Sequence, residues 1–347
     1  MPAPPDLRWQ LADDDRQGAL FEEELGRRPG EGEFRGMEFI HVRARRIVNG
    51  VPKASMVPFR YTINAYRGCS HACSYCFARP THEFLGMNTG DDFERRIVVK
   101  VNAVERLRAE LAPAKWGGHH IAMGTNTDPY QRCEGKYRLT RGIVRELSAA
   151  RNPFSILTKS TLILRDLDLL AEAATRTDVA ANFSIGTLDD DVWRATEPGT
   201  PHPMRRVEAV ARLNQAGVRC GVLIAPVLPG LSDQPEQLEA VVKACVEAGA
   251  RTISPLLLHL RPGVKEHYLG WLNDAHPELV AEHERLYPRA YAPRARQERL
   301  AALVRDLAAS HGMPASHPRE ARAVTRSAQT EAAPKPAAAG RQLELGL

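Results

Sequence analysis

The sequence contains no apolar run as long as the roughly 18 residues that a membrane-spanning helix requires. Its first fifteen residues, MPAPPDLRWQLADDD, contain no basic region followed by an apolar stretch, so we expect no secretory signal. There are six cysteines in 347 residues, and three of them are clustered, which suits a reducing cytoplasm better than an extracellular disulfide scaffold. We therefore expect a cytoplasmic protein without a membrane partner.

The composition is that of a folded protein with a large core. Hydrophobic residues make up 43% of the chain and charged residues 26%. The length of 347 residues suggests two domains, although an α/β barrel of about 250 residues can form a single one. The net charge of +5 permits a nucleic-acid partner but does not require one, because it is spread over the whole chain.

A cluster of cysteines lies within residues 61–86, in a C-x3-C-x2-C pattern formed by Cys69, Cys73 and Cys76. Thiolates are soft ligands for iron–sulfur clusters and zinc, and this spacing can bring three of them to one metal centre. A structural zinc site requires four protein ligands, and no fourth cysteine lies nearby. Three thiolates on a four-iron cluster would leave one iron free to bind a small molecule.

Two other interpretations of the cysteines stay open. His71 and His82 are nitrogen ligands that would complete a zinc site with the cysteines. A disulfide is less favoured, since three clustered cysteines cannot all pair with one another.

From residue 60 onward, apolar runs alternate with amphipathic segments. The apolar runs predict six strands, over residues 61–66, 119–125, 154–159, 179–187, 218–226 and 252–258. The segments between them predict helices over residues 139–150, 165–175, 203–216 and 234–248, with Thr140 as an N-cap and Gly249 at a C-terminus. Strands that alternate with helices indicate an α/β fold with a parallel sheet.

The flanking segments have a different character. Residues 1–36 predict a partly ordered arm with a short helix at about 18–26, and residues 39–48 alternate as an edge strand would. Residues 294–311 predict an amphipathic helix that covers the core through Leu300, Leu303, Val304 and Leu307. Residues 313–341 have too few apolar side chains to form a core, so we expect disorder there.

The motif C-x3-C-x-aromatic-C, with Tyr75 before the third cysteine, resembles the signature of the radical S-adenosylmethionine (radical SAM) enzymes. The resemblance implies a 4Fe-4S cluster whose open iron binds the amino and carboxylate groups of S-adenosylmethionine. It also implies reductive cleavage of that cofactor to a 5′-deoxyadenosyl radical, with a reductant such as flavodoxin or ferredoxin. Tyr75 would pack near the adenine, or would simply pack beside the cluster.

The same resemblance implies an open six-stranded parallel (β/α)6 partial TIM barrel, with the chemistry at the C-terminal ends of its strands. The expected organisation has an N-terminal arm and edge strand, a radical SAM core, a C-terminal helical cover and a disordered tail. These parts correspond to residues 1–59, 60–262, 263–312 and 313–347.

Polar residues follow the predicted strands and are candidates for binding the cofactor. Thr127, and next Asn126, would bond the amino group of the methionine moiety, while Asp128 either joins them or only caps a turn. Lys159 would pair with the carboxylate, and Ser184 would contact ribose or carboxylate.

A further cofactor contact is expected after the fourth predicted strand. Arg206 would hold a carboxylate with both arms of its guanidinium, and Glu197 could orient it. We assign no catalytic residue beyond the cluster and cofactor ligands.

Residues 60–260 resemble the spore photoproduct lyase branch of this family more than the family at large. The likeness includes Thr158-Lys159, the FSI at 183–185, and Glu197-Pro198 followed by Arg206. The lyases supply a hydrogen-donating cysteine at the position of Thr125. Cys133 is either a substitute for it or a plain buried thiol, and Cys220 and Cys245 are expected to be core residues.

Three functions remain open at this point. The first is a radical SAM enzyme that abstracts hydrogen from an unidentified substrate, with DNA, in a repair-like reaction, as one case. The second is modification of RNA or a peptide by the same chemistry. The third is a non-enzymatic nucleic-acid-associated protein with a structural metal site.

The C-terminal residues Gln342–Leu347, QLELGL, place leucines at alternate positions after a glutamine. They resemble the peptide by which bacterial repair proteins dock on the replicative sliding clamp. The clamp is therefore an expected partner, which the tail would reach as a flexible tether.

Overall fold

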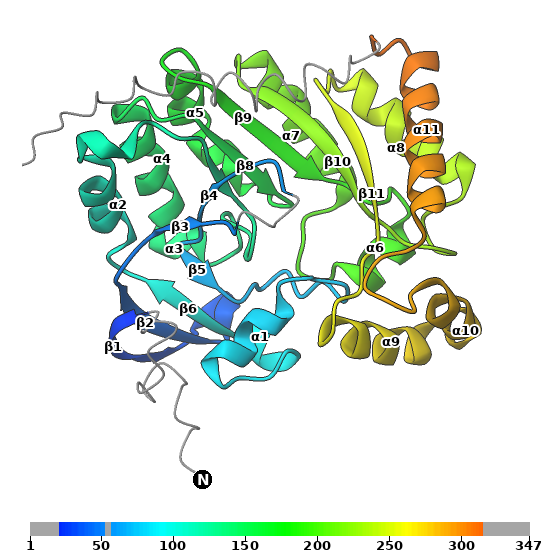
Figure 1. Ribbon diagram of the computed structural model, residues 1–347, viewed down its shortest axis with the longest axis horizontal. Helices are drawn as coiled ribbons and strands as arrows, with labels where there is room; N and C mark the ends of the chain where they lie inside the picture. Colours follow the sequence, from blue (N-terminus) through cyan, green and yellow to red (C-terminus); the bar gives the residue numbers. More distant parts are fainter. Residues whose placement is uncertain (1–20, 53–56, 315–347) are drawn as a thin grey trace, which may run out of the picture. The chain divides into compact units, whose positions relative to one another are not determined.

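The computed structural model describes residues 21–52 and 57–314. Its larger sheet has the strand order β11-β10-β9-β8-β7-β4-β3 (Figure 1). All neighbours from β4 to β11 pair in parallel, and β3 at one edge is antiparallel to β4. These strands are β3 (Val48–Gly50), β4 (Tyr61–Ile63), β7 (Ile121–Met123), β8 (Phe154–Thr158), β9 (Val179–Ser184), β10 (Arg219–Val227) and β11 (Ile253–Leu257). The α/β class and the open sheet expected from the sequence are confirmed.

Helices follow the central strands and pack beside the sheet (Figure 1). They are α4 (Leu139–Ala149), α5 (Leu167–Ala174), α7 (Pro203–Gln215) and α8 (Pro235–Glu247). The predictions for α4, α7 and α8 are correct to within one residue at each end. Helix α4 shows why: Ile143, Val144 and Leu147 lie on one face at helical spacing, and all three are buried. The predicted helix at 165–175 corresponds to α5, but its first two residues belong to a preceding 3₁₀ turn, η4 (Thr161–Asp166).

The C-terminal helix α11 (Arg294–Ser310) packs against β11 and α8, with Leu300 and Val304 buried. The helical cover predicted for residues 294–311 is thus present. Within the part of the chain that the structure describes, no helix is long and apolar enough to cross a membrane. The other helices are η1 (Gly32–Phe34), η2 (Arg79–Leu85), α1 (Asp91–Arg95), α2 (Ala103–Leu111), η3 (Ala114–Trp116), α3 (Glu134–Tyr137), α6 (Asp190–Thr196), α9 (Val264–Ala275) and α10 (Pro277–Leu286).

A second, four-stranded sheet has the order β1-β2-β6-β5. Its strands are β1 (Phe21–Pro29), β2 (Glu38–Ala44), β5 (Tyr66–Arg67) and β6 (Arg96–Lys100). The helix predicted at 18–26 was wrong, because its described residues belong to β1. The glutamates there favour a helix locally, but antiparallel pairing with β2 supplies the backbone hydrogen bonds instead.

Two strand predictions also require correction. Strand β2 is not an edge strand, since β1 and β6 flank it on both sides. The run at 61–66 divides into β4 in the larger sheet and β5 in the smaller one, so the chain passes from one sheet to the other just before the cysteines.

Of the two helix caps expected from the sequence, one is wrong and one is confirmed. Thr140 is not an N-cap, because α4 already begins at Leu139 and the Thr140 hydroxyl donates to the Pro129 carbonyl at 2.5 Å. Gly249 follows the end of α8 with a φ of +72°, the left-handed conformation expected after a helix. The predictions for residues 1–20 and 315–347, including Gln342–Leu347, lie outside the described residues, and the domain boundaries stay predictions.

The loop that carries the cysteines is held by a buried arginine at the start of η2. Arg79 is fully buried, and its Nε and one terminal nitrogen donate to the Cys73 carbonyl at 3.1 and 2.8 Å. The guanidinium also bonds the carbonyls of Thr89 and Gly90 and the Glu94 carboxylate. Arg79 therefore fixes the path of the cysteine loop against the segment that leads into α1.

We expect Arg79→Ala to destabilise the protein by about 3 kcal/mol, because it leaves buried carbonyls and the Glu94 carboxylate without their cationic donor. Chemical unfolding followed by circular dichroism measures the change. Arg108→Ala is the control, since Arg108 is 70% exposed in its ion pair with Glu146 and should matter much less. Equal losses in the two variants would contradict this role for Arg79.

Candidate functional site

The three motif cysteines line one cavity of about 170 Å³. Cys69 and Cys73 are buried and Cys76 is half-buried, and all three thiols are free. The rest of the lining comes from the cysteine loop itself and from residues in or just after β7, β8, β9, β10 and β11, among them Asn126, Lys159, Ser184, Pro226 and Leu258. The cavity thus lies at the carboxyl ends of the parallel strands, where the sequence placed the site.

The loop after β7 holds the first half of the cysteine loop through side-chain hydrogen bonds. The Gly68 carbonyl accepts from the Thr127 hydroxyl at 2.6 Å and from Gln131 Nε2 at 3.0 Å. The backbone N–H of Ser70 donates to Gln131 Oε1 at 3.0 Å. The Thr127 hydroxyl is therefore already engaged with the loop. Asn126 lines the cavity too, and its backbone N–H donates to Asn64.

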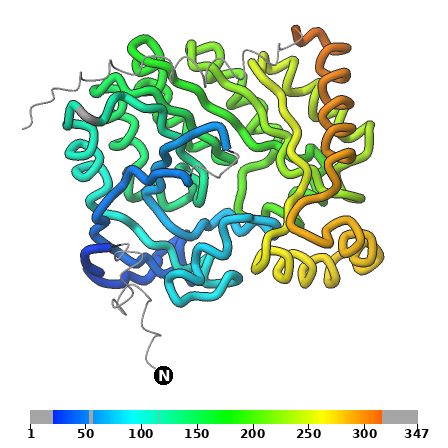
Figure 2. The backbone as a smooth tube through the Cα atoms, in the orientation of Figure 1, coloured from blue at the N-terminus to red at the C-terminus, as the bar shows by residue number. Residues whose placement is uncertain are grey.

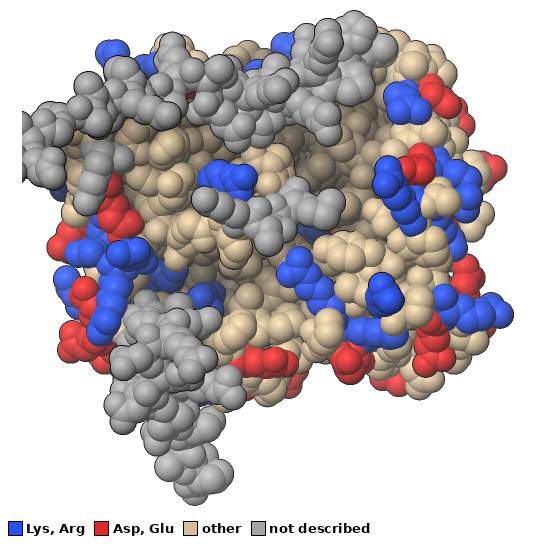
Figure 3. Space-filling model, in the orientation of Figure 1, with Lys and Arg blue, Asp and Glu red and all other residues tan. Residues whose placement is uncertain are grey.

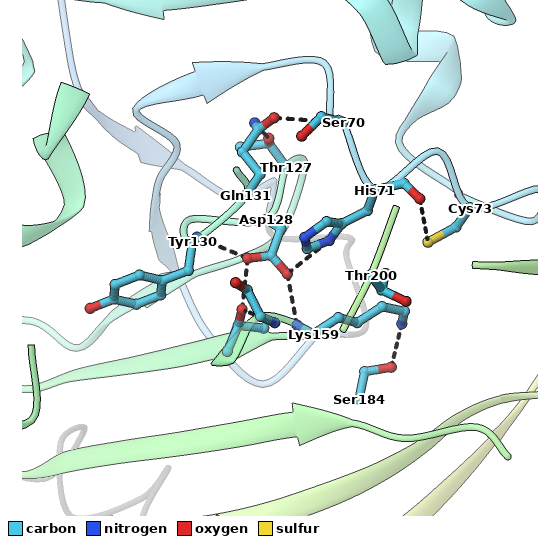
Figure 4. A network of polar contacts seen from close by, with 12 residues as sticks. Ser70, His71, Cys73, Thr127, Asp128, Tyr130, Gln131, Lys159, Ser184 and Thr200 are labelled. Carbon is cyan, nitrogen blue, oxygen red and sulfur yellow. Dashed lines mark hydrogen bonds and ion pairs between the residues drawn. The ribbon is translucent and has the colours of Figure 1, made fainter. Parts of the chain in front are cut away.

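Asp128 connects three of the loops around the cavity. One carboxylate oxygen accepts from the Tyr130 backbone at 2.8 Å and from the Thr158 hydroxyl at 2.7 Å. The other oxygen accepts from the Lys159 backbone at 2.7 Å and lies 3.4 Å from Nδ1 of His71 (Figure 4). Asp128 caps the turn at Pro129, which was one of the two roles predicted from the sequence. It also positions the residues that follow β8.

The Lys159 ammonium reaches across the cavity wall to the end of β9. It donates to the Ser184 hydroxyl at 2.5 Å, and that hydroxyl donates to the Ala225 carbonyl at 2.5 Å. The ammonium also lies 5.5 Å from the centre of the Tyr75 ring, on which a cation is favourably placed. The structure therefore brings Tyr75, Lys159 and Ser184 together, as the site hypothesis requires.

A buried carboxylate, Glu197, stands behind this group. Its oxygens accept from the Tyr75 hydroxyl and pair with Arg206 at 2.5 Å, and Lys159 Nζ lies 3.7 Å away. Burial alone would raise the pKa of Glu197, but the charges of Arg206 and Lys159 and the hydrogen bond from Tyr75 outweigh it and lower the pKa to about 2. Glu197 is therefore ionised.

Arg206 is fully buried and does not line the cavity. Besides Glu197 it bonds the carbonyls of Pro201 and Ser184 and the Thr200 hydroxyl. In this arrangement it orients Glu197 and the end of β9, which reverses the sequence-based expectation that Glu197 would orient Arg206.

Burial raises the pKa of each of the three cysteine thiols, because a thiolate is costly to form in an apolar cavity. A metal centre would supply the positive charge that compensates this cost. Among the residues of the described ranges, no three His, Cys, Asp or Glu side chains are grouped to hold a single metal ion. Three thiols spread along a cavity wall suit a centre made of several metal atoms.

Other candidates lie away from the cavity. His82 is buried against Phe93 and bonds the Arg96 carbonyl at 3.1 Å, so it is not placed to complete a zinc site. Cys133, Cys220 and Cys245 are fully buried and line no part of the cavity. Cys133 is therefore a core thiol in this structure, and Thr125 occupies the cavity wall.

The sequence analysis considered His71 only as a zinc ligand, and it missed Gln131 and Asn64. His71 lines the cavity and contacts Asp128. Gln131 and Asn64 act through hydrogen bonds to groups more than 60 residues away, and no local pattern indicates such contacts.

Comparison with known proteins agrees with this geometry. A sequence model of the Radical SAM superfamily matches residues 63–249, more than half of the chain. An uncharacterised protein of Mycobacterium tuberculosis is 45% identical over 286 residues, which cover 82% of this chain and 84% of that protein. An uncharacterised protein of Methanocaldococcus jannaschii is 29% identical over 199 residues, covering 57% of this chain and 70% of that protein.

Among solved structures, spore photoproduct lyase complexed with dinucleoside spore photoproduct is similar in fold, with a TM-score of 0.56 and 16% sequence identity. The similarity covers 82% of this chain and 84% of that one. The matched superfamily region includes all three cysteines as well as Asn126, Lys159 and Ser184. The chain therefore belongs to the radical SAM superfamily.

Proposed function

We propose that this protein is a radical SAM enzyme in which Cys69, Cys73 and Cys76 hold a 4Fe-4S cluster and the adjoining cavity binds S-adenosylmethionine. The observation that carries the proposal is the placement of three free thiols and the Lys159–Ser184 pair in one cavity at the carboxyl ends of the strands. Reductive cleavage of the bound cofactor would supply a 5′-deoxyadenosyl radical that abstracts hydrogen from the substrate. The sheet would then be the open (β/α)6 partial TIM barrel of this superfamily.

The residues of the chain have separate tasks in this proposal. Lys159 and Ser184 bind the carboxylate end of the methionine moiety, and Asn126 and Thr127 lie on the side of its amino group. Glu197 and Arg206 keep Tyr75 and Lys159 in place. The apolar side chains of Leu157, Leu223, Pro226 and Leu258 form a wall that excludes water and can receive the adenine.

We propose DNA as the substrate class, and the structural relative in complex with a dinucleoside photoproduct supports this proposal. The alternatives are an RNA or peptide substrate and a structural metal site without catalysis. Because Thr125 occupies the position of the lyases' hydrogen-donating cysteine, the proposal does not include a cysteine that donates hydrogen to the substrate radical from that position. A reductant such as flavodoxin or ferredoxin would deliver the electron.

We expect anaerobically reconstituted and reduced protein to form 5′-deoxyadenosine, and Cys73→Ala to form almost none. The alanine removes one of three thiolates, which leaves the cluster without adequate ligands. Iron and sulfide content and product chromatography measure both effects. Cys133→Ala is the matched control, because that thiol is buried away from the cavity. Undiminished product from Cys73→Ala would exclude the proposed cluster.

We expect Lys159→Ala and Ser184→Ala to weaken S-adenosylmethionine binding while iron content stays normal. Each removes a polar contact worth about 1–3 kcal/mol, which corresponds to roughly 5- to 150-fold in affinity. Equilibrium binding to the reconstituted variants is the measurement, with Arg108→Ala as a surface control. Unchanged affinity in both variants would remove the two residues from the cofactor site.

We also propose that Gln342–Leu347 binds the bacterial sliding clamp, with the leucines in an apolar pocket and the glutamine at its rim. Titration of a labelled peptide of residues 335–347 against purified clamp tests this. We expect the peptide to bind measurably better than a variant with Gln342, Leu343 and Leu345 changed to Ala. Equal binding by the two peptides would end the hypothesis.

A further inference from the structure

Three rings form a ladder that leads out of the cavity to the surface. The centroids of Phe77 and His259 are 5.7 Å apart, and those of His259 and Tyr291 are 5.5 Å apart with an interplanar angle of 16°. Phe77 and His259 line the cavity, whereas Tyr291 stands outside it. Phe77 follows the third motif cysteine directly, so the ladder begins at the proposed cluster and ends in solvent.

The side chains of the ladder are unusually exposed to solvent for aromatic residues. Phe77 is 39% exposed, Tyr291 is 56% exposed, and the neighbouring Leu256 of β11, which also lines the cavity, is 47% exposed. Exposed aromatic and apolar side chains at the mouth of a cavity are typical of a surface that a ligand covers. A stacked pair whose outer ring is more than half exposed leaves room for one more ring.

The backbone holds these rings in place. His259 and Tyr291 form an antiparallel β-bridge, and the Leu260 N–H donates to the Ala290 carbonyl at 2.7 Å. Their chain neighbours Leu258, Leu260 and Ala292 are buried, which anchors the two segments. Figure 2 shows the yellow segment after β11 running beside the orange segment that leads into α11. A rigid pair of this kind loses little conformational freedom when a ligand stacks on it.

A positively charged side chain, that of Arg261, lies near the rings. Arg261, two residues after His259, is exposed and close enough to help burial lower the pKa of His259. A ring platform flanked by an arginine matches a nucleotide, which offers a planar base and an anionic phosphate. On the face drawn in Figure 3, basic and acidic side chains both lie around surface that belongs to uncharged residues.

We propose that Phe77, His259 and Tyr291 form a stacking platform for a nucleobase of single-stranded or unpaired nucleic acid, with Arg261 contacting its backbone. The proposal rests on the proposed function, because it places the base next to the radical-forming cavity. The inner rings would guide a base into the cavity, and Tyr291 would stack the neighbouring base outside it. An aromatic side chain of a peptide is the competing occupant, and the test separates the two.

The experiment uses full-length reconstituted protein and a fluorescent oligothymidylate of about 12 nucleotides, a typical length for such sites. A second probe has the same backbone but abasic residues. We expect the wild type to bind the base-containing probe about tenfold more tightly than the abasic one by anisotropy. Tyr291→Ala should abolish that preference, Tyr291→Phe should keep it, and Arg261→Ala should weaken both probes alike.

Phe84→Ala is the matched control, since Phe84 is a 52% exposed aromatic residue that does not line the cavity. Equal binding of the two probes by wild type, no binding of either, or equal effects of Tyr291→Ala and Phe84→Ala would overturn the platform. So would a fluorescent tyrosine-containing peptide whose binding Tyr291→Ala abolishes while the binding of oligothymidylate stays unchanged. Iron content and 5′-deoxyadenosine formation without substrate are measured on the same wild-type preparation, so failure of the platform in a protein that cleaves the cofactor is distinct from failure of the proposed function.

Discussion

The buried ion pair between Glu197 and Arg206 is the interaction on which the rest of the site depends. A carboxylate this deep in the protein is stable only if cations and hydrogen-bond donors surround it. Arg206 pairs with one carboxylate oxygen of Glu197, while Tyr75 and Lys159 lie beside the other oxygen. The position of the aromatic residue in the cysteine motif and the position of the cation after β8 are therefore set by the same carboxylate.

This arrangement has a consequence for anion binding. Lys159 lies 3.7 Å from Glu197, whereas Arg206 is much closer to it. Because Arg206 already compensates most of the carboxylate charge, Lys159 retains positive charge to offer toward the cavity. A cofactor carboxylate would meet a cation that is held in place but not fully neutralised, which is the arrangement that favours binding without a large rearrangement.

The sequence was sufficient to predict the features that depend on residues close together in the chain. The cysteine spacing identified the family, and the alternation of strands and helices placed Lys159 and Ser184 at the carboxyl ends of two strands. It was insufficient where distant segments decide the outcome. Strand β1 forms because β2 lies beside it, although its glutamates favour a helix. The roles of Gln131 and Arg79 depend on backbone carbonyls whose positions no local pattern reveals.

Backbone contacts hold the cysteine loop to the rest of the fold. Arg79 bonds the Cys73 carbonyl, the Cys69 N–H donates to the Phe93 carbonyl, and Gln131 bonds the Ser70 N–H. All of these contacts are made to backbone atoms of the loop, so they leave the thiols available to a metal centre. Since burial raises the pKa of the thiols, binding of a metal centre would have to displace their protons.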